Sequence, residues 1–301
     1  MIFEPQRLEP QSLEPQRLET QRLETQRLET RARSINTPKD QRGFNLIELL
    51  IAIVIGIFIS LMIVQYMATS SRVFKRQGAD SNLEQNASFA ISYLSQFIRQ
   101  AGTRDEYGSV VPFFTEDCDG LDPCTSDGTG TASPTAAATS DTIAVQMHPV
   151  DGLDCTGQVI TAGDQLVNVF YIAASAEDPD VNSLYCRGFN ATTGFRISDG
   201  IALIDGIDQM QIQYGVTNED ERIYSYFDAA RVPPINGSLL QGWDRIRAVK
   251  IAILVSDGFD STTENLDTRS FQLLDGPELS ITDRTNRRVF STTIAMNSKL
   301  L

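Results

Sequence analysis

The hydrophobic pattern begins with a long run that carries no charge. Residues 49–68 contain no charged side chain, and only Ser60 and Gln65 among them are clearly polar. A helix of this length spans about 30 Å, the thickness of the hydrocarbon core of a bilayer. The run therefore predicts a membrane-spanning helix over about residues 46–68. It is too long for a typical core helix or signal core, and no A-x-A cleavage site follows it.

Beyond the run, apolar residues recur at steps of three and four, which is typical of one face of a helix. The members of this stripe are Leu83, Ala87, Ala90, Ile91, Leu94, Phe97 and Ile98. No proline occurs between Phe44 and Val111, and Gly102 is suited to end a helix. We predict one continuous helix over residues 44–101, whose second part lies on a globular domain.

The pattern changes again after a stretch rich in Gly, Ser, Thr, Asp and Pro over residues 102–140, which predicts a loop. Short segments rich in β-branched and aromatic residues follow, and they predict strands. These segments are 141–147, 165–174, 183–189, 207–216, 245–255 and 287–296. Strands after one long helix predict an α+β fold, with a mainly antiparallel β-sheet domain over residues 102–301.

One predicted strand alternates strictly. Apolar side chains at positions 210, 212 and 214 alternate with Gln209, Gln211 and Gln213. This period of two predicts a strand with one buried face and one face in water.

The first 30 residues follow a different rule. Residues 4–30 are a pentapeptide repeat with a leucine at every fifth position. A step of five advances about 140° on a helix, so the leucines form no stripe, and prolines interrupt the first half. We predict a disordered extension that contributes nothing to the fold.

The composition argues against several classes of function. The net charge is −14, which disfavours nucleic acid because phosphate contacts need clustered Lys and Arg. There is one histidine, His148, and no catalytic motif such as G-x-S-x-G. We therefore expect no enzyme activity, catalytic residue, cofactor or metal. The best rival is a membrane-anchored periplasmic enzyme or binding module, with Asp117, Asp119 and Asp122 as calcium ligands, although their spacing departs from the EF-hand pattern.

All four cysteines lie C-terminal to the apolar run: Cys118, Cys124, Cys155 and Cys186. An even number beyond a membrane segment suits disulfides in an oxidising compartment, and the alternative is four buried thiols in a cytosolic domain. Three pairings are possible. We favour Cys118–Cys124, which closes a short loop, and Cys155–Cys186, which ties two segments together.

The start of the apolar run carries a carboxylate, Glu48. A carboxylate inside a bilayer is costly and marks a functional position by default. Glu48 lies five residues after Gly43, which ends a polar segment that contains Lys39 and Arg42.

The stretch "RGFNLIELLIAIVIG" resembles the class III signal of type IV pilins and of type II secretion pseudopilins. The resemblance implies that a prepilin peptidase cleaves after Gly43 on the cytoplasmic side and that Phe44 becomes the N-methylated first residue. Residues 1–43 are then a leader that is removed, and Glu48 is the glutamate at the fifth mature position.

A role for Glu48 also follows from charge. A buried amine on Phe44 and a buried carboxylate are each costly alone and tolerable as a pair. In a filament, the amine of one subunit and Glu48 of a neighbour could neutralise each other and define the axial register. The alternative is that Glu48 reaches the cytoplasmic interface and has no specific role.

Three C-terminal segments resemble one branch of this superfamily. "LIDGIDQMQIQYGV", "WDRIRAVKIAILV" and "NRRVFSTTIAMNSKL" are similar to PilW-family minor pilins, which are thought to prime assembly and to sit near the pilus tip. The rival within the superfamily is a J-type minor pseudopilin of a type II secretion system. The sequence departs from major pilins in lacking a proline midway along the membrane helix.

The resemblance also implies location and partners. The chain is expected to cross the bacterial inner membrane once, with its N-terminus cytoplasmic and its C-terminal domain periplasmic, and to reach the pilus and cell surface after assembly. The implied partners are a prepilin peptidase, other minor and major pilins, the inner-membrane assembly platform and, before assembly, the lipid bilayer.

Overall fold

The computed structural model describes residues 43–103, 108, 110–121, 123–128, 140–149, 151–257 and 266–296, without the side chains of residues 239–240. Residues 1–42, which include the pentapeptide repeat, lie outside the described residues, as do residues 104–107, 109, 122 and 129–139 of the predicted loop. The chain divides into two units, and the boundary falls between Tyr66 and Met67.

The first unit contributes the beginning of helix α2, which runs from Leu46 to Gln100. Helix α2 is long and apolar enough to cross a membrane, and no residue of its apolar 18-residue segment is buried. Large apolar side chains between Leu46 and Tyr66 are all at least half exposed. Such a surface in water is unfavourable, so a lipid or protein environment must cover it.

The second unit begins with the remainder of α2, and the predicted stripe is confirmed. Five of its members are buried, and Ile91 and Phe97 are partly buried against the same core. The buried members are Leu83, Ala87, Ala90, Leu94 and Ile98. The helix ends where predicted, because Gly102 adopts a φ of +66° and donates its N–H to the carbonyl of Gln146 at 2.9 Å.

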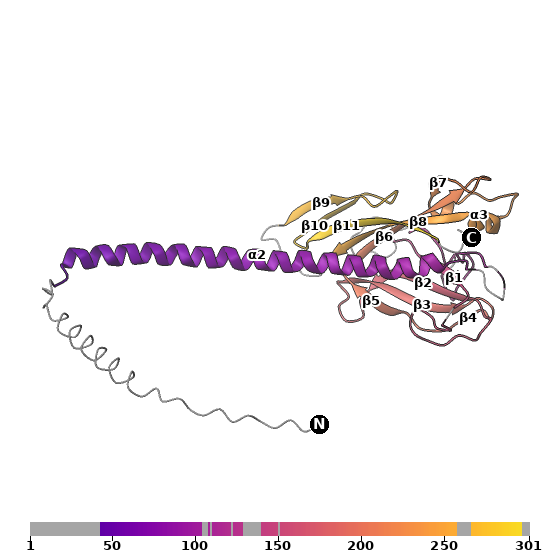
Figure 1. The fold of residues 1–301 in the computed structure, drawn as a ribbon, viewed down its shortest axis with the longest axis horizontal. Coiled ribbons are helices and arrows are strands. Elements are labelled where there is room, and N and C mark those ends of the chain that lie inside the picture. The colour runs from indigo at the N-terminus through magenta and orange to yellow at the C-terminus, as the bar shows by residue number, and fades with distance from the viewer. Residues whose placement is uncertain are drawn as a thin grey trace, which may run out of the picture. The chain divides into compact units, whose positions relative to one another are not determined.

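The strands of the second unit form antiparallel sheets, which confirms the α+β prediction (Figure 1). A five-stranded sheet has the order β1-β2-β3-β4, with β5 also paired to β3. Its members are β1 (Ile143–Met147), β2 (Leu166–Ala174), β3 (Asn182–Asn190), β4 (Phe195–Arg196) and β5 (Ile201–Asp205). A four-stranded sheet has the order β11-β8-β6-β7. Its members are β6 (Ile207–Thr217), β7 (Ile223–Phe227), β8 (Ile246–Ser256) and β11 (Arg287–Ala295).

The remaining elements are short. Strands β9 (Asp267–Phe271) and β10 (Leu279–Asp283) form a separate hairpin, and a 3₁₀ helix, η2 (Ala229–Arg231), and helix α3 (Leu239–Asp244) join β7 to β8. All six predicted strands are present, as β1, β2, β3, β6, β8 and β11. The other five strands were not predicted.

One core joins the helix stripe to the inward faces of both larger sheets. It includes Leu94 of α2, Phe170 of β2, Met210 of β6 and Ile253 of β8. The register of β6 and β8 explains why both Met210 and Ile253 lie in this core. The two residues are paired across the strands, so their side chains lie on the same face of the sheet.

The prediction that one face of β6 is exposed to water is wrong. Gln209 and Gln211 are only 1% and 7% exposed. The hairpin β9–β10 covers this face of the sheet with a second apolar cluster that includes Leu254, Leu279 and Ile281. The alternation of apolar and polar residues shows that one face of β6 is polar. It does not show whether another part of the chain covers that face.

Candidate processing and assembly site

The three residues that the sequence singles out, Gly43, Phe44 and Glu48, lie at the exposed start of helix α2. Gly43, Phe44 and Asn45 immediately precede α2, and Glu48 lies in its first turn. Phe44 is 86% exposed. A Cβ placed on Gly43 would meet no described atom within 4 Å, and Gly43 has no positive φ. The fold of the described residues therefore gives no reason for a glycine at this position.

Local hydrogen bonds explain why the helix starts here. The carbonyl of Asn45 accepts from the N–H groups of Glu48, at 2.9 Å, and of Leu49, at 3.2 Å. Asn45 thus occupies the cap position, where asparagine is preferred. Glu48 follows at the third helical position, where a carboxylate is favoured by the unpaired N–H groups of the first turn.

The structure pairs the cysteines in the way that the sequence favours. The Cα atoms of Cys118 and Cys124 are 5.7 Å apart, and both residues belong to an apolar cluster on the outer face of the five-stranded sheet. Arg187 of β3 donates from Nη2 to the carbonyl of Cys118 at 2.6 Å. The disulfide therefore closes a loop that is also held to the sheet by a charged donor.

The second disulfide lies in the main core. Cys155 and Cys186 have Cα atoms 6.3 Å apart, and Cys186 is part of β3. The hydroxyl of Tyr93 on α2 donates to the carbonyl of Cys155 at 2.8 Å. This disulfide therefore joins a loop and a strand at a point that α2 also contacts.

The acidic loop around the first disulfide uses its carboxylates internally. Asp117 accepts from the N–H of Gly120 at 2.9 Å, and Asp119 lies 3.1 Å from Nε of Arg196. Asp122 lies outside the described residues. Among the residues that the structure describes, no three His, Cys, Asp or Glu side chains are grouped to hold a metal. The calcium alternative gains no support from these positions.

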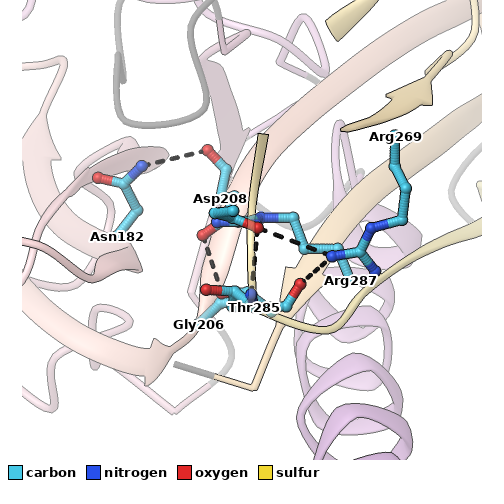
Figure 2. A network of polar contacts seen from close by, with 8 residues as sticks. Asn182, Gly206, Asp208, Arg269, Thr285 and Arg287 are labelled. Carbon is cyan, nitrogen blue, oxygen red and sulfur yellow. Dashed lines mark hydrogen bonds and ion pairs between the residues drawn. The ribbon is translucent and has the colours of Figure 1, made fainter. Parts of the chain in front are cut away.

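A buried ionic network in the four-stranded sheet was not predicted (Figure 2). Arg287 of β11 donates from Nε to Asp208 of β6 at 2.6 Å and also pairs with Asp283. Ser256 donates to the second oxygen of Asp208 at 2.9 Å. Burial raises the pKa of Asp208, and the charge of Arg287 opposes that rise. The charge of Asp208 within a predicted strand is the one signal that could have indicated a buried partner.

A second buried carboxyl, Asp141, joins the two larger sheets. Its two oxygens accept from the N–H of Gly128 at 3.0 Å and from the N–H of Ile212 at 2.7 Å. Its own N–H donates to the carbonyl of Met210. Burial raises the pKa of Asp141 to about 8, although both accepted hydrogen bonds lower it. Asp141 thus connects the start of β1 to β6.

Comparison with known proteins agrees with the resemblance seen in the sequence. Residues 169–298 match the model of the family described as type IV pilus-assembly protein W. The match covers a little under half of the chain, from within β2 to beyond β11. It confirms the resemblance to PilW-type pilins.

A type IV-like pilin from Thermus thermophilus, a solved structure, aligns at 11% identity with a TM-score of 0.41, covering 72% of this chain and 97% of that chain. A search of curated proteins finds no significant match.

Proposed function

We propose that this PilW-like type IV pilin is a minor prepilin, anchored in the bacterial inner membrane by α2 and processed by a prepilin peptidase after Gly43. The observation that carries the proposal is the position of Gly43 and Phe44. Both lie immediately before an apolar, membrane-length helix, and the same chain carries a PilW-like β domain.

The chain is the substrate of processing and performs no chemistry itself. Hydrolysis of the Gly43–Phe44 peptide bond adds one water, leaving a carboxylate on Gly43 and an amine on Phe44. An exposed peptide is accessible to a peptidase. Since the described fold does not need a glycine at position 43, the absence of a side chain serves the peptidase. The resemblance adds N-methylation of the new amine.

The positive charge of the new Phe44 amine is unfavourable at this position, and the carboxylate of Glu48 can compensate it. A cation at the beginning of a helix faces the positive end of the helix dipole, which is unfavourable. In an apolar surrounding it also needs a counter-charge. Glu48 lies one helical turn away along the chain. In a filament, the amine of one subunit pairs with Glu48 of its neighbour, and apolar packing of α2 supplies cohesion.

The globular domain then faces outward and contacts other pilus components. The matching family is described as a pilus-assembly protein, which supports a role in the pilus. The finer role, in which the subunit primes assembly or occupies the tip, rests on the resemblance of its C-terminal segments to minor pilins. A J-type pseudopilin shares the signal and the long helix. Expression in a pilus mutant and in a type II secretion mutant tests the two roles, because only the correct one restores its own phenotype.

The processing step is tested by N-terminal sequencing and intact mass of the membrane-extracted full chain, expressed with and without a prepilin peptidase. We expect a chain beginning at methylated Phe44 only when the peptidase is present. Gly43→Leu should block cleavage. Gly56→Leu is the matched control, because Gly56 also has no described atom near its Cβ position, and it should be processed normally. A chain that stays uncleaved, or is cut after the apolar run, would refute the proposal.

A further inference from the structure

Helix α2 carries a group of cations just beyond its apolar run. Arg72, Lys75 and Arg76 are exposed, and residues 67–79 contain no carboxylate. Residues 80–301 hold 14 basic and 31 acidic side chains, a net charge of 14 − 31 = −17. The chain therefore places a small positive segment between an apolar run and a strongly acidic domain.

Helix geometry gives this segment a direction. Steps of three and four residues place the three cations within about 100° of one another on one side of the helix. In an α-helix, each Cα–Cβ bond tilts toward the N-terminus. The long side chains of this group therefore extend back toward the apolar run. Arg72 lies four residues past Ala68, the last residue of the run, a rise of about 6 Å.

That height corresponds to the headgroup layer of a bilayer whose hydrocarbon core contains the run. Lys and Arg at the end of a span keep their stems in apolar surroundings and place the charged end at the interface. A guanidinium binds a phosphate through two parallel hydrogen bonds, and an ammonium binds it as a point charge.

We propose that Arg72, Lys75 and Arg76 bind lipid phosphates of the leaflet next to the globular domain and so hold this acidic protein at an anionic membrane before assembly. The inference rests on the membrane anchoring in the proposed function. Two observations favour a lipid surface. Cations on the far side of a span oppose the positive-inside rule for an N-in protein, so their presence calls for a reason. The acidic domain is itself repelled by anionic lipid, and these cations offset that repulsion at the point of contact.

The test uses the full chain in vesicles of phosphatidylcholine with about 30 mol% phosphatidylglycerol, an anionic lipid. Gly78 is exposed and has no described atom near its Cβ position, so Gly78→Cys can carry a fluorophore two residues beyond Arg76. Quenching by nitroxide-labelled phosphatidylglycerol is compared with quenching by nitroxide-labelled phosphatidylcholine. We expect a preference for the anionic lipid of about fivefold for each cation that engages, equivalent to about 1 kcal/mol.

The variant R72Q/K75Q/R76Q should lose the preference. The matched control R99Q/R196Q/R222Q removes three exposed cations elsewhere and should keep it. A wild-type chain without the preference, or a triple variant that retains it, would overturn the proposal. Loss of the preference on adding inorganic phosphate, but not sulfate of equal ionic strength, would indicate a free-phosphate site and would also overturn it.

An alkaline wash of the vesicles separates this inference from the proposed function. A chain that resists the wash but shows no lipid preference contradicts only the phosphate contacts. A chain that is washed off contradicts the membrane anchor and this inference together.

Discussion

Arg287 and Asp208, 79 residues apart in the sequence, form an ion pair of 2.6 Å in which both side chains are less than 10% exposed. The pair joins β11 to β6 across β8, because β8 pairs with both strands. Asp283 and Ser256 complete the hydrogen bonds around the two charges.

Removal of one charge from this pair should be costly. Arg287→Leu leaves Asp208 buried without its cation, and we expect a loss of about 3–5 kcal/mol in the free energy of unfolding. The double variant Asp208→Leu/Arg287→Leu should recover much of this loss, because no charge remains buried. Denaturant unfolding of the full chain in detergent measures both values.

The neighbouring residue provides the control for that measurement. Arg288 forms an exposed pair with Glu84 at 3.0 Å, and Arg288→Leu should cost less than about 1 kcal/mol. Equal losses for Arg287→Leu and Arg288→Leu would show that burial of the Arg287 pair has no energetic consequence.

The buried carboxyl of Asp141 should make stability depend on pH. Burial raises its pKa from 3.8 to about 8, so between these values the folded state binds more protons than the unfolded state. The contribution of the protonated Asp141 carboxyl to the free energy of unfolding therefore has its full value below about pH 4. It decreases as the pH rises toward about 8. Unfolding of the full chain at about pH 5 and about pH 8.5 should show the lower stability at the higher pH.

Asp141→Asn isolates this effect. The variant cannot titrate, so its stability should change less with pH than that of the wild type. It should be less stable at low pH by about 1–3 kcal/mol, because an amide nitrogen cannot accept one of the two backbone N–H groups. Asp180→Asn, an exposed change, should keep the wild-type pH profile. Parallel profiles for wild type and Asp141→Asn would contradict the assignment.

The sequence predicts elements whose signal is local and misses those defined by distant partners. The stripe of α2 was visible because each turn of the helix repeats it, and the six long strands were visible through their apolar composition. The signal at Gly43, Phe44 and Glu48 lies within six residues, so its motif was readable directly. Strand β4 has two residues, and β9 and β10 are mostly polar in sequence. These strands exist because of the partners that they pair with.

The wrong prediction for β6 and the contacts that were not predicted also depend on distant partners. Gln209 and Gln211 were expected in water because alternation describes one strand, whereas the hairpin β9–β10 that encloses them lies more than 50 residues further along the chain. The pairing of Asp208 with Arg287 and the contacts of Asp141 likewise depend on sheet order, which local pattern does not reveal.

Gly188 should be intolerant of a side chain. A Cβ at this position would overlap with Oδ2 of Asp154. Asp154 accepts from Thr156 and Gln158 within the loop of Cys155 and from Ser198 beyond β4. Gly188→Ala should therefore displace Asp154 and destabilise the fold by about 1–3 kcal/mol, seen as a lower unfolding midpoint of the full chain.

A second glycine tests whether space is the cause. Gly78 lies in α2 with no described atom within 4 Å of its Cβ position. Alanine favours a helix over glycine by about 0.5–1 kcal/mol, so Gly78→Ala should not lower the midpoint. A tolerated Gly188→Ala would mean that Asp154 moves freely and does not hold the loop.

Glu48 has two physical roles that one substitution can separate. As a first-turn carboxylate it stabilises the helix N-terminus by about 0.3–1 kcal/mol. As the partner of the Phe44 amine of a neighbouring subunit it would compensate a buried charge, and loss of that compensation costs several times more.

Glu48→Gln preserves the size of the side chain and removes its charge. We expect normal cleavage after Gly43 but a strong loss of the subunit from sheared pili, measured by immunoblot against the membrane pool. Glu84→Gln, an exposed change on the same helix, should leave incorporation unchanged. Normal incorporation of Glu48→Gln would reduce Glu48 to its local role in the helix and leave the filament register to apolar packing alone.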